Sequence, residues 1–206
     1  PFTWDEFKEM GVYFPPMTYK KYEKGLLRAD GKPGFKSPTG RVELWSTVKN
    51  HLGEDPLPYY EEPRFSKRSR PEWAEKYPLE FVTGARRATS FHTEHRMIDS
   101  LREIRKYATV EINPTTAERY GIHQGDWVKI ENPWGACEMV ADVTPIVKED
   151  VIGCDHGWWY PEEKNSELFG VWKSNINELM PWKEIGKLGL GSHYGALPCK
   201  ISRAEG

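Results

Sequence analysis

Polar and apolar residues alternate along several short stretches in the second half of the chain, as they do in strands that bury one face. These stretches are residues 80–83, 109–112, 127–130, 137–143, 151–152 and 199–201. Turn-forming residues lie between them. Short strands that recur with turn signals between them predict a small, mostly β barrel.

A short helix is predicted between the second and third of these strands. Asn113 is a favoured N-cap, Pro114 suits the first helical turn, and Gly121 can end the helix in a left-handed conformation. Residues 132–135 (Asn-Pro-Trp-Gly) are favoured in a type I turn, which predicts a tight hairpin. A barrel of this kind leaves loops at one rim free to hold a ligand.

The first 77 residues follow a different pattern. A capping box at residues 3–6 predicts a short helix that runs to Met10 and stops at Gly11. Residues 14–78 are dense in Pro, Gly, Lys and Glu, with one strand-like run at 41–45. Because such a segment buries little apolar area, we expect an irregular N-terminal arm or linker over residues 1–77, followed by the barrel domain over residues 78–206.

Composition narrows the range of partners. The 206 residues carry a formal net charge of −2, so no global field favours a nucleic acid or a membrane surface. No apolar run approaches the roughly 20 residues that span a bilayer. The three cysteines are far apart in sequence, which argues against a disulfide framework. The start at Pro1 suggests a fragment, and the compartment stays open between the cytoplasm and the periplasm of a prokaryote.

The loop after the first barrel strand combines hydroxyls, a glycine, arginines and histidines. These residues are Thr83, Gly84, Arg86, Arg87, His92, Thr93 and Arg96. Gly84 permits a tight turn, and hydroxyls, backbone amides and guanidinium groups together suit the oxygens of a diphosphate. A solvated surface loop is the competing interpretation of this stretch taken alone.

Two further segments could hold a flat ligand. His156, Gly157 and Trp158 follow the apolar run that ends at Cys154, so an imidazole and an indole could cover a planar heterocycle at the barrel rim, although tryptophans at such places also pack into the core. Residues 174–177, if extended, would present two asparagine side chains to the polar edge of a pterin or purine. Turns and local caps are the commoner use of asparagine in loops.

Several other chemistries lack their motifs. The glycine spacings fit neither a dinucleotide-binding G-x-G-x-x-G nor a triphosphate-binding loop, and no G-x-S-x-G surrounds a serine nucleophile. A zinc site would have to draw on Cys154, His156, His193 and Cys199, which lack the paired C-x-x-C spacing.

Taken in order, these segments resemble the C-terminal dinucleotide-binding domain of the molybdopterin oxidoreductases, the dimethyl sulfoxide reductase family. The resemblance follows residues 83–86, His92, Arg96, 110–114, 120–122, 125–128, 156–159, Asn175 and Asn177. Residues 34–44 also resemble the segment that leads into this domain, so the resemblance covers most of the chain.

The resemblance implies a six-stranded double-psi β-barrel with short helices. It also implies one or both guanine dinucleotide forms of molybdopterin as the ligand (bis-MGD when both are present), with molybdenum or tungsten. By analogy, the residues near the diphosphate and pterin are Thr83, Gly84, Arg86, His92 and Thr93. The residues at the pterin are His156, Gly157 and Trp158, and Asn177 is placed on the same heterocycle.

The family's iron-sulfur segment and metal-ligating residue have no match in this chain. The resemblance therefore implies that the rest of a parent polypeptide supplies them, and that this part holds no catalytic or metal-ligating residue. Residues 156–161 and 197–201 are most similar to the acetylene hydratase branch, which permits hydration rather than redox chemistry.

Two other functions stay open at this point. One is a protein- or peptide-binding barrel that uses Trp158 and Trp159 as anchors and needs no pterin. The other is a glycosidase that uses carboxylates such as Glu94 and Asp155, although that reaction leaves the arginine-rich loop unexplained.

Overall fold

The computed structural model describes residues 2–186, 195 and 197–204. Contacts within the chain divide it into two compact units, Pro1–Tyr60 and Glu61–Gly206. The second unit begins before the boundary expected at residues 77 and 78, because Phe65 packs into the barrel core and is only 4% exposed. The division into an arm and a family domain at residue 77 stays a prediction.

The first unit contains helix α1 (Trp4–Met10), helix α2 (Thr47–His51) and otherwise irregular chain. The predicted capping box is present, since Thr3 accepts a hydrogen bond from the Glu6 amide and the Glu6 carboxylate accepts one from the Thr3 amide. Within residues 2–60 only two glycines are buried. The unit therefore has no apolar core among its described residues, as the composition predicts.

The strand predicted at residues 41–45 does not form. The Glu43 carboxylate instead accepts hydrogen bonds from the backbone amide and hydroxyl of both Thr39 and Thr47, which closes a local turn. No strand is described in residues 2–60 to pair with this run. An apolar alternation over five residues is too short to make a strand without such a partner.

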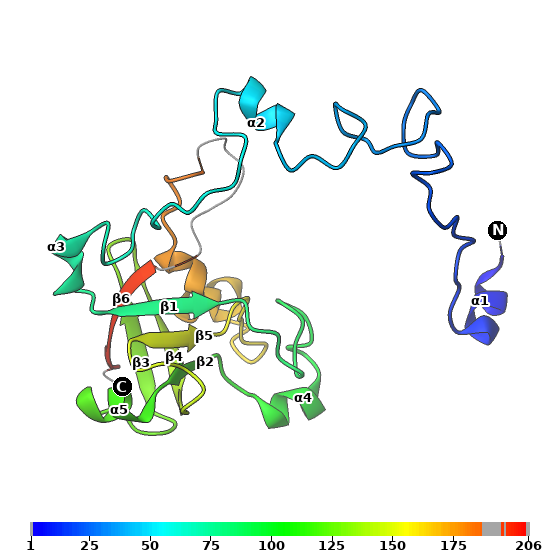
Figure 1. Cartoon of the computed structure of the whole chain (residues 1–206). Helices are drawn as coiled ribbons and strands as arrows, with labels where there is room; N and C mark the ends of the chain where they lie inside the picture. The colour runs from blue at the N-terminus through cyan, green and yellow to red at the C-terminus, as the bar shows by residue number, and fades with distance from the viewer. Residues whose placement is uncertain (1, 187–194, 196, 205–206) are drawn as a thin grey trace. The chain divides into compact units, whose positions relative to one another are not determined.

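The second unit is a closed six-stranded barrel (Figure 1). Its strands are β1 (Leu79–Thr83), β2 (Thr109–Ile112), β3 (Trp127–Glu131), β4 (Ala136–Val143), β5 (Val151–Cys154) and β6 (Leu197–Arg203). Their order around the barrel is β1-β5-β2-β4-β3-β6, in which β1 runs parallel to β5, β2 runs parallel to β4, and the other pairs are antiparallel. Parallel neighbours require crossover connections, so the chain crosses over between β1 and β5 and between β2 and β4. The closed mixed barrel confirms the predicted double-psi barrel.

Alternation places the barrel core where the sequence predicts it. Along β2, β3 and the first part of β4 every second residue is buried, as a two-residue side-chain period requires. The register pairs Val110 with Ala141 and Val128 with Met139, and all four are at most 1% exposed.

The helix and the hairpin between β2 and β4 also form as predicted. Helix α5 (Pro114–Arg119) has the Asn113 side chain as its cap, and Gly121 follows it with φ = 62°. In the hairpin the Asn132 side-chain oxygen accepts from the amides of Trp134 and Gly135, while its nitrogen donates to the Leu179 carbonyl. Asn132 thus fixes the turn and ties it to the segment before β6.

Helix α2 and four short helical segments of the second unit were not predicted. The four segments are α3 (Pro71–Ala74), α4 (Asp99–Ile104), and the 3₁₀ segments η1 (Glu167–Lys173) and η2 (Ile176–Leu179). None exceeds seven residues, so none offers the sustained helical periodicity that sequence patterns detect. Among the described helices none is long and apolar enough to cross a membrane.

A methyl group at Gly135 should destabilise the barrel. An added Cβ would lie 2.4 Å from the Glu178 carbonyl oxygen, which is backbone and cannot move aside easily. We expect Gly135→Ala to cost about 2 kcal/mol of unfolding free energy, in the range of ordinary overpacking. Urea denaturation followed by tryptophan fluorescence measures this loss. Gly195→Ala is the control, because its Cβ would meet nothing within 4 Å, and equal effects of the two changes would contradict the prediction.

Candidate functional site

Two loops leave the barrel side by side because β1 and β5 are parallel neighbours. Thr83, the last residue of β1, pairs with Cys154, the last residue of β5. The β1 loop (residues 84–98) and the β5 loop (residues 155–160) therefore start from the same rim (Figure 1). The barrel register thus brings together two candidate segments that lie about 70 residues apart in the sequence.

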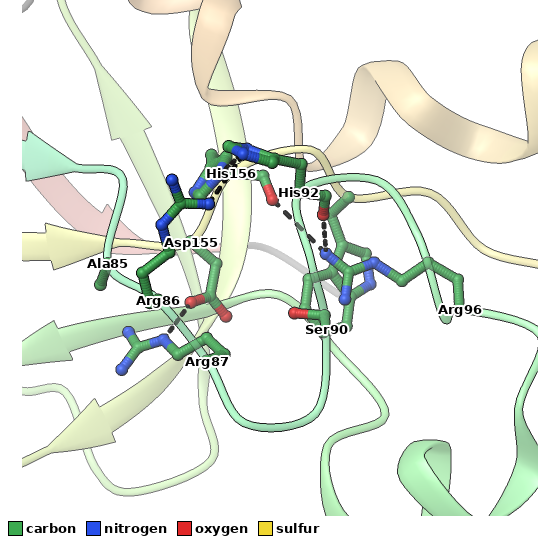
Figure 2. Close-up of a pocket in the computed structure, with 9 residues that line it drawn as sticks. Ala85, Arg86, Arg87, Ser90, His92, Arg96, Asp155 and His156 are labelled. Atoms are coloured by element: carbon green, nitrogen blue, oxygen red, sulfur yellow. Dashed lines mark hydrogen bonds and ion pairs between the residues drawn. The ribbon is translucent and has the colours of Figure 1, made fainter. Parts of the chain in front are cut away.

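A pocket lies between these two loops. It is lined by Ala85, Arg86, Arg87, Ser90, His92, Arg96, Asp155, His156 and Trp158. Figure 2 shows Arg86, His92 and His156 together on one side of it, with Arg87 against Asp155 below them. Four predicted site residues line this pocket, namely Arg86, His92, His156 and Trp158.

A directed chain of hydrogen bonds links the arginine to the two histidines. Arg86 Nη1 lies 2.7 Å from His92 Nε2, and His92 Nδ1 lies 3.0 Å from His156 Nε2 (Figure 2). A guanidinium group can only donate, so His92 Nε2 accepts and its Nδ1–H donates to His156. Both rings are then neutral, and the proton of His156 is on Nδ1.

The electrostatics of the pocket favour that neutral form. Burial lowers the pKa of His156 below its ordinary value of 6.5, and the nearby His92, Arg86 and Arg96 lower it further, against the opposing effect of Asp155. His156 therefore enters the site as an uncharged hydrogen-bonding ring.

Asp155 is a buried anion that joins the barrel to the β1 loop. Its side chain accepts from Arg87 Nε at 2.7 Å, from Arg105 Nη1 at 2.9 Å and from the Thr109 amide at 2.9 Å. Burial alone would raise the pKa of Asp155, but the Thr109 amide and the two guanidinium groups hold it below the ordinary value of 3.8. Arg87 also binds Glu111 at 2.6 Å, which anchors it to β2.

Arg96 differs from the free phosphate donor that its sequence context predicts. It is 3% exposed, and its Nη2 donates to the backbone carbonyls of His92, Gly157 and His156 at 2.9, 3.3 and 3.4 Å. Its guanidinium carbon lies 3.7 Å from the centre of the Trp158 ring, a cation–π contact. Burial lowers the pKa of Arg96 to about 10, so the group stays charged at neutral pH.

The site carries an excess of positive charge and unsatisfied donors. Four arginines (Arg86, Arg87, Arg96, Arg105) face two carboxylates (Asp155, Glu111) in and beside the pocket, an excess of two cations. Buried polar atoms without a partner in the described part of the chain are Thr83 Oγ1, Arg87 Nη2, Thr89 Oγ1, Arg96 Nε and Trp158 Nε1. Such atoms are costly unless a ligand or water satisfies them, so the residues fit a phosphorylated, hydrogen-bonding heterocycle.

The remaining predicted residues of the two loops shape the site. Gly84 adopts φ = 93° and Gly157 adopts φ = 63°, both left-handed conformations that favour glycine. A Cβ on Gly157 would lie 3.0 Å from the carbonyl atoms of His92. The Thr93 carbonyl accepts from Trp159 Nε1 at 2.8 Å. These contacts hold the β1 loop against the β5 loop.

Asn177 lies elsewhere. Residues 174–177 are not extended and show the alternative use of asparagine as a local cap, because Asn175 caps η2 by accepting from the Asn177 amide at 3.1 Å and Ile176 is buried. Asn177 is exposed and does not line the pocket. Its contact with a heterocycle stays a prediction.

Sequence patterns missed Arg105 and Glu111 as parts of the site. Both act through Asp155 or Arg87, and only the barrel register reveals this. The alternative zinc site depends partly on His193, which lies outside the described residues. Within the described part no three metal-binding side chains gather. Burial raises the pKa of Cys154 and of Cys199 well above the ordinary value of 9.0, which disfavours the thiolates that zinc requires.

The barrel and its cationic pocket together define a cofactor-binding domain. A family description, the Molydopterin dinucleotide binding domain, matches residues 79–189. The match covers more than half of the chain, so the chain belongs to this family. The predicted family is thereby confirmed.

Known relatives agree with this assignment. The chain is 40% identical over 210 residues to dopamine dehydroxylase of Eggerthella lenta, covering 86% of this chain and 20% of that protein. It is 30% identical over 167 residues to acetylene hydratase of Syntrophotalea acetylenica, covering 81% and 22%. The solved structure of acetylene hydratase from Pelobacter acetylenicus matches 98% of this chain and 28% of that one, with a TM-score of 0.81 and 27% identity. These matches bear out the predicted similarity to the acetylene hydratase branch. The chain spans about a fifth of the length of the curated relatives.

The buried anion gives a pH-dependent prediction. Asp155→Asn should cost about 3 kcal/mol of unfolding free energy at neutral pH, because it leaves Arg105 without its countercharge and leaves Arg87 with Glu111 alone. Since the folded-state pKa of Asp155 is lowered, its contribution is complete above pH 3.8 and is lost as the pH falls through the lower value. Denaturation of both variants from pH 7 down to pH 3 should show the difference shrinking, with the exposed Asp150→Asn as control. A difference that does not change with pH would contradict the account.

The histidine chain predicts a titration. By NMR of histidine-labelled protein, His156 should titrate below 6.5, and its pKa should rise in His92→Ala while staying below 6.5, since burial remains. Stability linked to His156 should accordingly be present above pH 6.5 and decline as the pH falls below it. A wild-type pKa at or above 6.5 would rule out the neutral ring.

Proposed function

We propose that this chain is the C-terminal, cofactor-binding part of a larger molybdenum or tungsten enzyme. In this proposal the pocket between the two loops binds the guanine dinucleotide form of molybdopterin. The ligand is one or both of the two pterins of a bis-MGD group. The observation that carries the proposal is a pocket, in a barrel of this family, that is lined by three arginines and one carboxylate. Three of its lining residues, Arg87, Arg96 and Trp158, carry buried polar atoms without a partner among the described residues.

The chemistry of each donor suggests its part. Arg86 and the Thr83 hydroxyl offer donors to a diphosphate, and Gly84 lets the backbone approach it closely. His156 offers a ring N–H group to the edge of a pterin. The Trp158 ring, which is 1% exposed, forms the wall of the pocket beside it. Asn177 does not line the pocket, so it would contact the ligand only if the ligand extends beyond the pocket. Thr93 contributes by its carbonyl, which fixes Trp159 beside the loop.

The pterin and its metal, when bound, supply the redox or hydration chemistry. The residues of this chain bind and orient the group, and their burial excludes water from one side of it. Because the chain spans about a fifth of its relatives, we place the metal-ligating residue and any iron-sulfur segment in the rest of the parent polypeptide. The substrates named for the relatives belong to those proteins and differ between them, so they fix no substrate here.

Two alternatives are less well supported. A peptide-binding barrel would need Trp158 and Trp159 as accessible anchors. The Trp158 ring is 1% exposed and covered by Arg96, and the Trp159 Nε1 group already donates to the Thr93 carbonyl. A glycosidase would need a carboxylic acid that is protonated near neutral pH, whereas two arginines hold the pKa of Asp155 low.

Removing either end of the Arg86–His92–His156 chain should weaken cofactor retention. In the full-length enzyme, Arg86→Ala or His156→Ala should lower the pterin content by at least about tenfold under limiting cofactor, corresponding to about 1.4 kcal/mol or more of lost binding. Both variants should fold, because neither side chain belongs to the buried core. Pterin content is measured by fluorescence after oxidative release.

Arg119→Ala is the matched control for these variants. Arg119 is half exposed, lies on α5 and pairs with Glu149, away from both pocket loops. It should retain normal pterin. Normal pterin content in both Arg86→Ala and His156→Ala would overturn the proposed function.

A further inference from the structure

Arg96 is an unusual buried cation. Its guanidinium group is almost fully removed from water, yet no carboxylate forms an ion pair with it among the described residues. Both oxygens of the nearest acid that influences it, Asp155, are occupied by Arg87, Arg105 and Thr109. Burying such a charge is costly unless its hydrogen bonds do something specific.

The bonds of Arg96 join the two pocket loops. One nitrogen donates to the carbonyl of His92 in the β1 loop and to the carbonyls of His156 and Gly157 in the β5 loop. Figure 2 shows this guanidinium directed at the backbone carbonyls of His92 and His156. The two residues it fixes by their backbones are the same two whose rings bond to each other at 3.0 Å.

Local backbone geometry shows that this approach is under constraint. His92 is a non-glycine residue held at φ = 50°, a strained conformation that persists only where its surroundings impose it. Gly157 lies against the His92 carbonyl, and an added Cβ would lie only 3.0 Å from it, so the neighbouring loop would have to shift. The flat face of Arg96 stacks on Trp158, which sets the orientation of the guanidinium.

We propose that Arg96 is a positioning residue for the pocket: it holds His92 and His156 in register through their backbone carbonyls, so that the two imidazoles meet the ligand as one preformed unit. This inference rests on the proposed function. It assigns Arg96 no contact with the pterin, which distinguishes it from Arg86. A lysine keeps the charge but cannot stack as a plane or bridge both loops in the same way.

A double-mutant cycle in the full-length holoenzyme tests the proposal. Arg96→Lys is made in the wild type and in a His92→Ala/His156→Ala background, and the rate of pterin release is measured by fluorescence after oxidation. In the wild type we expect release to accelerate about tenfold, a common contribution of residues that support a bound group. In the double-alanine background we expect less than a twofold change, because the side chains that Arg96 positions are gone.

Controls separate positioning from folding. Arg102→Lys alters another mostly buried arginine, one that bonds to Glu162 and to the Lys106 carbonyl, and should leave the release rate unchanged. Gly157→Ala pushes the loops apart while Arg96 stays intact, and should accelerate release with the same dependence on the two histidines. If Arg96→Lys fails to fold, Gly157→Ala tests the positioning of the two histidines instead.

The possible failures are distinguishable. An equal acceleration by Arg96→Lys in both backgrounds would overturn the inference, since Arg96 would then act on the ligand directly or on the whole fold. A wild-type release rate in the His92→Ala/His156→Ala protein itself would overturn the proposed function, and the inference with it.

Discussion

The buried carboxylate of Asp155 is the point on which the site depends. Asp155 directly follows β5. Its carboxylate accepts hydrogen bonds from Arg87 in the β1 loop, from Arg105 at the end of α4 and from the Thr109 amide at the start of β2. Three consecutive elements of the chain are therefore tied to one anion that lies about 50 residues further along the sequence. Because the strands beneath are held by the barrel register, the pocket loops are fixed to a rigid base.

The charges and hydrogen bonds of the pocket determine which ligand it can bind. The anion neutralises part of the positive charge, and the remainder stays available to a ligand. Arg86, His92 and His156 form a directed chain of hydrogen bonds, so the site recognises a heterocycle by directed hydrogen bonds as well as by charge. Arg96 contributes in a different way, since its charge is used within the protein to hold the two loops together.

The barrel could be predicted from the sequence because each strand shows its own local signal. Alternation at β2, β3 and β4, the cap at Asn113 and the turn at Asn132 each act within a few residues. The run at 41–45 had a similar signal but no neighbouring strand, so alternation alone was misleading there. The short helices, including the η2 turn that redirects Asn177, depend on tertiary contacts that local patterns do not contain. The ordered motifs indicated the cofactor class, whereas the roles of Arg96, Arg105 and Glu111 depend on which loops the barrel places together.

The central claim is that the β1 and β5 loops form one pocket for a phosphorylated pterin. The most direct test is an experimental structure of the full-length enzyme with its cofactor bound. The account predicts ligand phosphate oxygens within hydrogen-bond distance of the β1 loop and a pterin edge beside His156 and Trp158. A pterin bound elsewhere, with these two loops contacting only protein or solvent, would contradict it.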